Sequence, residues 1–375
     1  MRSSNLKIDF CEDQAIISTA AREFCLDNSN TTTSRQLINC KLGFNQDIWE
    51  QITELGWTGI NIPEQYGGIN LGIKCAVPIV EQMGKTMMSL PYISLLLATE
   101  VIVRLGNRQQ QEKWLPLFCQ GKIGTVAFLD NEDWGSTDAS LELTEKEGAY
   151  VLDGEKLLVS DAEAADLLIV LARLKGNNVF VLVEASQINK SNFNSRTLID
   201  ETKRSSDVNF QHVIIDKENL INVSPDNVRN IKLLGALLTA AESVGTTSIT
   251  LDTIVSYLTT RKQFGKLIGS YQALKHPTVD ILLKLDSAKS LVYHAASLIE
   301  EGSLSDDSQI ACHMAKAQAS DALSFAGDRA VQFHGGMGFT YDCDAMLFIR
   351  RAQWAYQQFG DPQHHRKSVA RLVFK

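Results

Sequence analysis

The spacing of hydrophobic residues changes twice along the chain, and this alternation restricts the fold more than any other feature. In residues 13–121, apolar side chains recur every three or four residues, which places them on one face of a helix. Between about residues 122 and 224 the period shortens toward two, in β-branched and apolar runs such as 149–152 and 179–183. After Pro225 the helical spacing returns. The order is therefore helical, then β, then helical.

This order predicts a multidomain α+β fold, and 375 residues are enough for two or three domains. We expect an N-terminal helical domain in residues 1–121 and an antiparallel β-barrel or sandwich in residues 122–225. Residues 226–375 should form a C-terminal helical bundle. Its expected helices are 228–260, 272–301, 306–331 and about 344–358.

The bulk composition excludes several classes of protein. A net charge of −8 argues against nucleic acid as a main partner, because phosphate backbones are held by clustered lysine and arginine. No run approaches the ~20 apolar residues of a membrane span, and residues 1–7 lack the apolar core of a signal peptide. Seven scattered cysteines form no CxxC pair, so neither a zinc site nor a disulfide framework is indicated. We expect a soluble, cytoplasmic protein without a membrane or nucleic-acid partner.

Two segments of the helical C-terminal part carry residue types suited to a cofactor. Residues 334–342 are a glycine cluster that ends in an acid, and glycine lets a backbone approach a large anionic or flat ligand. Residues 261–272 contain an arginine that can fork onto phosphate oxygens, a glutamine and a phenylalanine. Taken alone, the second segment fits a polar loop between helices with one buried phenylalanine better.

Five ordered motifs along essentially the whole chain resemble the acyl-CoA dehydrogenase family. They are residues 55–68, 111–116, 152–156 with 165–170, 261–272 and 330–339. The resemblance implies a helical domain, a β domain and a C-terminal four-helix bundle, with FAD held between them and completed by a neighbouring subunit. It also implies the reaction, in which an acyl-CoA loses its α-proton to a carboxylate and its β-hydrogen passes as hydride to flavin N5, giving a 2,3-enoyl-CoA. The electrons would then leave to an electron-transfer flavoprotein.

The resemblance also implies which residues contact FAD. Arg261, Gln263 and Phe264 match positions that touch the FAD of the partner subunit, and Ser160 matches a hydroxyl beside the flavin ring. The remaining matched positions are Gln272, Gln332, Gly335, Gly336 and Gln363. Asp361 is a weaker candidate, because an acid near a flavin phosphate is repelled.

Two carboxylates are candidates for the catalytic base. In much of the family the base is a glutamate after the Gly-Gly motif, and counting lands on Asp342, which is one methylene shorter. A misplacement of roughly 1 Å can cost about 10²-fold in rate, so this exchange is not neutral. Other members carry the base at a position that matches Gly235, which cannot serve. Glu242 lies two turns further on the same helix face and is the alternative, although a buried glutamate paired with arginine or lysine would be structural.

Other positions depart from the family pattern. Residues 130–136 replace its Thr-Glu-Pro-Gly stretch, and Leu158 replaces an aromatic beside the flavin. Trp134 could stack on a ring, but a core position is favoured. Arg350 and Arg351 could pair with acids at a subunit interface or aid CoA binding, and a solvated face is favoured.

These departures resemble a divergent bacterial branch that acts on steroid side chains or other unusual acyl-CoAs. Members of that branch can be heterotetramers of two unlike subunits. We therefore weigh two functions: an FAD-dependent acyl-CoA dehydrogenase, as a homo- or hetero-oligomer, and a weakly active or structural FAD-binding partner of a second acyl-CoA dehydrogenase-like chain. An oxidase-like flavoenzyme has no positive sign in the sequence. His334, His364 and His365 lack companions at metal-ligand spacing, so no metal is expected.

Overall fold

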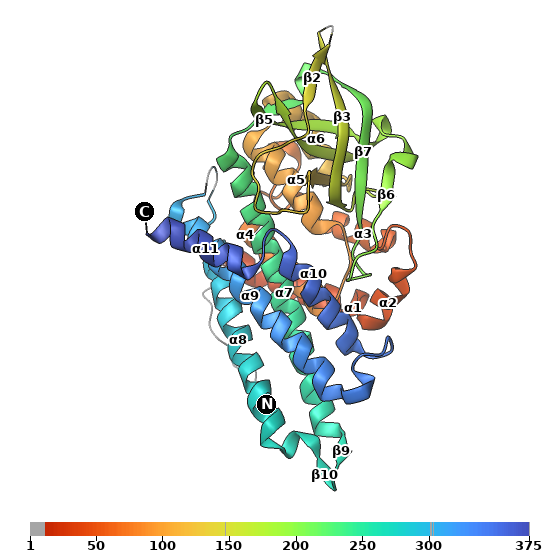
Figure 1. The fold of residues 1–375 in the computed structure, drawn as a ribbon, viewed down its shortest axis with the longest axis vertical. Helices are drawn as coiled ribbons and strands as arrows, with labels where there is room; N and C mark the ends of the chain where they lie inside the picture. Colours follow the sequence, from red (N-terminus) through yellow and green to blue (C-terminus); the bar gives the residue numbers. More distant parts are fainter. Residues whose placement is uncertain (1–11, 147, 301, 303, 375) are drawn as a thin grey trace.

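The computed structural model describes residues 12–146, 148–300, 302 and 304–374, and its elements follow the predicted order (Figure 1). Residues 1–7 and Cys11, used in the sequence argument, lie outside the described residues. The first part is helical. Its helices are α1 (Glu12–Asn28), α2 (Thr31–Ile38), α3 (Gln46–Glu54), α4 (Ile73–Lys85), α5 (Tyr92–Leu105) and α6 (Arg108–Cys119).

The middle part consists of two four-stranded sheets that do not close into a barrel. One sheet has the order β1-β4-β5-β8 and the other β2-β3-β7-β6. All pairs are antiparallel except β1 with β4, which is parallel. The strands are β1 (Gly124–Ala127), β2 (Leu143–Lys146), β3 (Ala149–Ser160), β4 (Leu167–Leu174), β5 (Asn177–Glu184), β6 (Phe193–Ser195), β7 (Ser205–Ile215) and β8 (Leu220–Asn222).

The C-terminal part is the predicted bundle with one further helix. The helices are α7 (Pro225–Thr260), α8 (Gln272–Ser297), α9 (Asp306–His334), α10 (Asp344–Gln357) and α11 (Pro362–Val373). Ser224 caps α7 in a capping box with Asn227, and Pro225 begins the helix without losing a backbone bond. The predicted second helix ends at Ser297, and Glu301 lies outside the described residues.

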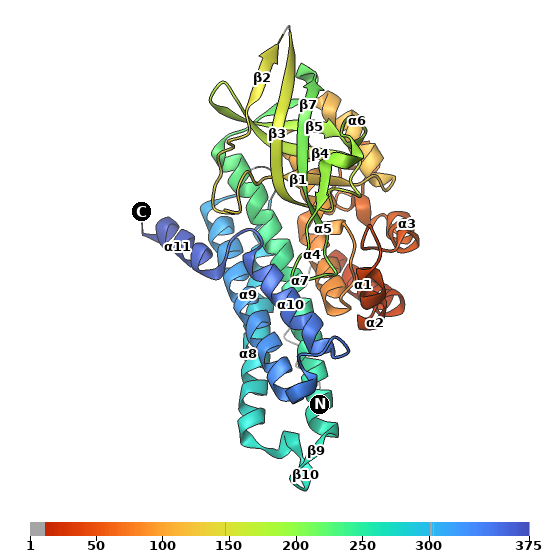
Figure 2. The ribbon, with the colours of Figure 1, turned by 45° about the vertical axis from the view of Figure 1, so that its right-hand side comes forward.

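Small side chains allow α9 to pack closely in the centre of this bundle. α9 contacts α7, α8, α10 and α11, and its buried face carries a row of alanines: Ala311, Ala315, Ala319, Ala322, Ala326 and Ala330. Figures 1 and 2 show α7, α8 and α9 side by side, extending away from the sheets. None of the described helices is long and apolar enough to cross a membrane. The domain boundaries near residues 121 and 225 stay predictions.

Two glycines bring the N-terminal helices against the bundle. A Cβ at Gly84 of α4 would collide with the backbone of Glu242, and one at Gly245 of α7 would collide with the backbone of Glu81. Only glycine therefore permits this crossing. Thr246 Oγ1 also donates a hydrogen bond to the Gly84 carbonyl, at 3.1 Å. The position of Glu242 on α7 is thus fixed by backbone contact with α4.

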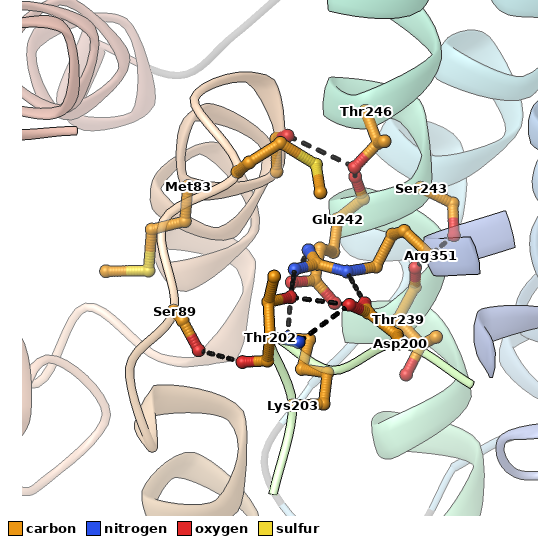
Figure 3. A network of polar contacts seen from close by, with 12 residues as sticks. Met83, Ser89, Asp200, Thr202, Lys203, Thr239, Glu242, Ser243, Thr246 and Arg351 are labelled. Carbon is orange, nitrogen blue, oxygen red and sulfur yellow. Dashed lines mark hydrogen bonds and ion pairs between the residues drawn. The ribbon is translucent and has the colours of Figure 1, made fainter. Parts of the chain in front are cut away.

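A buried ion cluster joins α7, α10 and the loop between β6 and β7 (Figure 3). Arg351 of α10 is 0% exposed and donates to Asp200, to Glu242 Oε1 at 2.8 Å and to Thr202 Oγ1 at 2.7 Å. Lys203 donates to the same Glu242 oxygen, at 2.6 Å. The interpretation of Arg351 as part of a solvated face is therefore wrong, because its guanidinium is surrounded by acids distant in sequence.

We expect Arg351→Met to lower the free energy of unfolding by about 3–5 kcal/mol, because it leaves the buried Asp200 without its paired cation and leaves Glu242 with Lys203 alone. Urea denaturation monitored by circular dichroism would measure this loss. Arg366→Met is the matched control, since Arg366 pairs with Asp321 on the surface and its side chain is 57% exposed. The control should cost less than about 1 kcal/mol. Equal losses in both variants would contradict the structural importance of the cluster.

Candidate functional site

A cavity, which we call the junction cavity, lies where the N-terminal helices, the sheets and the bundle meet. It is lined by residues from all three parts, including Ser94, Phe128, Trp134, Leu158, Ser160, Asp161, Lys203, Thr239 and Phe359. The predicted flavin neighbour Ser160 is thus at this cavity, and so are two departures from the family pattern, Trp134 and Leu158. The residues converge here from segments that are far apart in sequence.

Asp161 is the one carboxylate among the described residues that line the junction cavity. Ser94 Oγ donates a hydrogen bond to its Oδ2 at 2.6 Å. Burial raises the pKa of Asp161 to about 6, although the Ser94 hydrogen bond and the charge of Lys203 oppose the shift. Asp161 was not predicted as a site residue, although it directly follows Ser160 in the sequence.

A second site, which we call the hairpin cleft, lies at the end of the bundle. It joins the Gly-Gly segment to the hairpin of β9 (Lys262–Gln263) and β10 (Lys266–Leu267). The hairpin turns at Phe264 and Gly265, whose φ values of 53° and 78° are those of a type I′ turn. This turn leaves the Phe264 side chain 89% exposed at the tip.

The hairpin cleft brings together most of the predicted FAD contacts. Its volume is about 780 Å³, and Arg261, Gln263, Phe264, Gly335 and Gly336 all line it. No atom lies within 4 Å of the position that a Cβ would occupy at either glycine, so both open directly toward free space. An exposed guanidinium, an amide, an aromatic ring and bare backbone fit a large, flat, anionic cofactor such as FAD.

The other predicted contacts lie outside the lining of both sites. Gln272 is exposed as the first residue of α8, and Gln332 is exposed on the last turn of α9. Gln363 is exposed on the first turn of α11. Asp361 caps α11 through a hydrogen bond from the His364 backbone N–H at 2.6 Å, which gives this acid a structural role.

Neither predicted base lines the junction cavity. Asp342 is exposed in the loop before α10. Glu242 is 3% exposed, and its Oε1 is held by both Arg351 and Lys203, as Figure 3 shows. These two contacts hold Glu242 within the buried ion cluster, apart from the lining of the junction cavity.

The stretch that replaces the family's Thr-Glu-Pro-Gly motif is tied to the sheets by a buried lysine. Asp130 pairs with Lys156 at 2.6 Å, and Lys156 is fully buried. Trp134 packs on Phe359, with ring centroids 4.6 Å apart, and therefore contributes to an aromatic cluster. Within the described part of the chain, no group of three potential metal ligands comes together.

Comparison with known families assigns the chain. The model for the N-terminal domain of acyl-CoA dehydrogenase matches residues 11–122, and the model for the C-terminal domain matches residues 233–374. The chain belongs to the acyl-CoA dehydrogenase family. The resemblance predicted from the sequence is thereby confirmed, and the family comprises oxidoreductases that act on CH–CH bonds.

Relatives of this acyl-CoA dehydrogenase match it over nearly its whole length. Acyl-CoA dehydrogenase IpdE2 of Mycolicibacterium smegmatis is 26% identical over 366 residues, covering 97% of this chain and 99% of the relative. Butyryl-CoA dehydrogenase of Megasphaera elsdenii shares the fold with a TM-score of 0.87 at 21% identity, covering 99% of this chain and 100% of that chain. A chain of the ChsE4-ChsE5 complex from Mycobacterium tuberculosis gives 0.87 at 20% identity, covering 98% of both chains.

Asp161 should make the stability of the chain depend on pH. With a pKa of about 6 in the folded chain against 3.8 ordinarily, it holds its proton at pH values where the unfolded carboxyl has lost it. Stability contributed by the neutral carboxyl is therefore lost as pH rises from about 4 to 6. Lys203, Arg204 and Glu242 are the charged groups that act on it.

We expect Asp161→Asn to remove this loss, so that the variant gains about 2–3 kcal/mol over the wild type between pH 4 and pH 8. Urea denaturation at both pH values would measure the gain. Asp153→Asn, at an exposed carboxylate, is the matched control and should show no such gain. If the difference in unfolding free energy between Asp161→Asn and the wild type were the same at pH 4 and pH 8, the pKa of Asp161 would not be raised in the folded chain.

Proposed function

We propose that this chain acts in the FAD-dependent dehydrogenation of an acyl-CoA, within an assembly whose flavin sites are shared between chains. One observation carries the proposal: the predicted flavin contacts fall into two separate groups. Arg261, Phe264 and the Gly-Gly pair line the hairpin cleft, whereas Ser160 lines the junction cavity. In Figures 1 and 2 the β9–β10 hairpin lies at the opposite end of the molecule from the sheets. If the hairpin end of one chain packed against the junction cavity of another, the two groups of predicted flavin contacts would lie together.

The chemistry that we propose follows from this arrangement. When bound, FAD supplies the hydride acceptor at flavin N5. A carboxylate takes the α-proton of the acyl thioester and the β-hydrogen leaves as hydride, giving a 2,3-enoyl-CoA. On this chain, Arg261 would fork onto phosphate oxygens and Gly335 and Gly336 would admit the cofactor against the backbone. The Ser160 hydroxyl would donate a hydrogen bond toward the flavin ring.

We further propose that this chain is the weakly active or structural member of a heteromeric pair, and that a second acyl-CoA dehydrogenase-like chain holds the base. The position of the carboxylates favours this role. Asp342 is exposed outside both sites, and Glu242 is bound by two cations. The likeness to a chain of the ChsE4-ChsE5 complex, named for two chains, supports a hetero-oligomer.

The remaining partners are proposed from the family. We propose an acyl-CoA substrate and an electron-transfer flavoprotein as electron acceptor. Because the departures from the family pattern resemble the branch that acts on steroid side chains or other unusual acyl groups, we propose a substrate of that kind. A cytoplasmic location is supported by the cysteines in the described part of the chain, which are all free thiols.

Arg261→Ala combined with Phe264→Ala should lower the FAD retained by the purified assembly more than tenfold, because it removes two of the three exposed side chains, Arg261, Gln263 and Phe264, by which residues 261–267 line the hairpin cleft. The ratio of absorbance at 450 nm to that at 280 nm would measure retention. Both side chains are exposed, so the melting temperature of the chain should change little. Arg366→Ala, at an exposed arginine of α11, is the control and should retain FAD. Full retention in the double variant would contradict the role of the hairpin cleft.

Loaded with FAD but without a second chain, the protein should remain oxidised when mixed anaerobically with acyl-CoA. The test covers short, medium, branched and steroid-like acyl groups, and flavin bleaching is the measurement. Addition of a second acyl-CoA dehydrogenase-like chain that carries the glutamate should restore bleaching. In that assembly, Asp342→Asn and Glu242→Gln should leave the rate of bleaching within about twofold.

Bleaching by this chain alone, abolished by Asp342→Asn, would instead establish an active homomeric enzyme with Asp342 as its base. Bleaching abolished by Glu242→Gln, with Asp342→Asn unaffected, would assign the base to Glu242. Glu242→Gln needs a stability measurement beside it, because the residue belongs to the buried ion cluster.

A further inference from the structure

Two aromatic side chains separate the junction cavity from a second pocket. This second pocket, which we call the basic pocket, has a volume of about 460 Å³ and is lined by Arg229, Lys232, His313, His364, His365 and Arg371. Its lining contains no carboxylate among the described residues. Trp134 and Phe359 line both this pocket and the junction cavity, with ring centroids 4.6 Å apart. The two rings therefore stand between the two spaces.

The Phe359 ring packs against Gly235 of α7, where the missing side chain leaves a notch in the helix surface. A Cβ at Gly235 would lie 2.5 Å from the ring carbons of Phe359, so only glycine accommodates the ring in this position. The Phe359 backbone has φ +57°, a left-handed conformation that is unfavourable for a bulky residue and is followed by Gly360 at φ +107°. Such a conformation persists only where the surroundings enforce it.

A buried lysine anchors the turn that carries Phe359. Lys316 of α9 is fully buried, and its Nζ donates to the carbonyls of Ala355 at 3.0 Å and of Gly360 at 3.1 Å. These two carbonyls flank Phe359 in the chain, so the lysine fixes the turn on both sides of the aromatic residue. Within the described part of the chain no acid pairs with Lys316, and its Nζ is held by backbone carbonyls instead.

A second buried lysine holds Trp134 in a similar way. Lys232 of α7 donates to the carbonyls of Trp134, at 3.2 Å, and of Ser136, and its Nζ lies 5.9 Å above the indole ring. Phe128 packs at the edge of Phe359, with centroids 6.4 Å apart. Both rings are thus fixed by backbone anchors and neighbouring side chains.

We infer that Trp134 and Phe359 form a fixed partition that keeps an acyl chain in the basic pocket from reaching the junction cavity, so that this chain's own acyl site is closed. The inference rests on the proposed function, because it explains why the acyl group would be held by the second chain. Trp134 and Phe359 are then specificity-determining residues that exclude substrate from one subunit.

The test compares the binding of CoA and of octanoyl-CoA to the full chain loaded with FAD, by isothermal titration calorimetry. The wild type should show no preference for octanoyl-CoA beyond about threefold, because the partition keeps the acyl chain out of the junction cavity. Phe359→Ala removes the ring from the notch and should make octanoyl-CoA bind at least tenfold tighter than CoA. Trp134→Ala opens the partition from the other side and should show the same gain if Phe359→Ala does not fold.

Tyr356→Ala is the matched control, since this aromatic lies near the end of α10, three residues before Phe359, and lines neither cavity. It should behave as the wild type. A wild type that already prefers octanoyl-CoA tenfold, or two folded partition variants that gain no preference, would overturn the inference. A failure of the proposed function would be seen in flavin bleaching and FAD retention. It can therefore be distinguished from a failure of this inference, which is seen in the acyl preference.

Discussion

The arrangement of the site depends on how the Arg351 charge is buried. A guanidinium that is removed from water loses several kcal/mol of solvation, and it is tolerated only where acids and hydrogen bonds surround it. Here the acids come from two places, Asp200 on the β6–β7 loop and Glu242 on α7. Burial alone would raise the pKa of Asp200, but the charge of Arg351 and the Thr202 hydroxyl hold it below its ordinary value. The cluster is therefore satisfied only when the sheets, α7 and α10 meet in one arrangement.

This constraint reaches the N-terminal helices as well. Ser89, between α4 and α5, donates a hydrogen bond to the Thr202 carbonyl at 2.5 Å, so the loop that holds Arg351 is tied to the helical part too (Figure 3). The glycine crossing of α4 and α7 fixes the same helix segment that carries Glu242. Lys203 links the cluster to the junction cavity, which it lines, and α10 leads directly into the Phe359 turn. The shape of the cavity is thus a consequence of the ion cluster.

The order of elements and the four bundle helices could be predicted from the sequence, because hydrophobic periodicity is a local signal. α11 escaped prediction since it is short, has few apolar residues and depends on the Asp361 cap. The parallel pairing of β1 with β4 could not be predicted, because strand partners are often far apart in the chain. The burial of Arg351 escaped for the same reason: its acids lie 109 and 151 positions away.

The same distinction divides the two halves of the site. The hairpin cleft is made of two continuous motifs, so most of its residues could be named in advance. The junction cavity is lined by single residues from every part of the chain. The roles of Asp161 and Phe359 follow from their contacts with Ser94 and Gly235, which are distant from them in the sequence. A contact that depends on complementary shape, such as that of the Phe359 ring with Gly235, produces no recognisable pattern in a single sequence.

The central claim is that the hairpin cleft of this acyl-CoA dehydrogenase chain forms one part of a flavin site, and that another chain forms the rest. A structure of the purified, FAD-containing assembly by electron cryomicroscopy tests it most directly. The account predicts density for FAD that contacts Arg261 and Phe264 of this chain, while its flavin ring lies in the junction of a different chain. An FAD whose contacts all come from one copy of this chain would contradict the account.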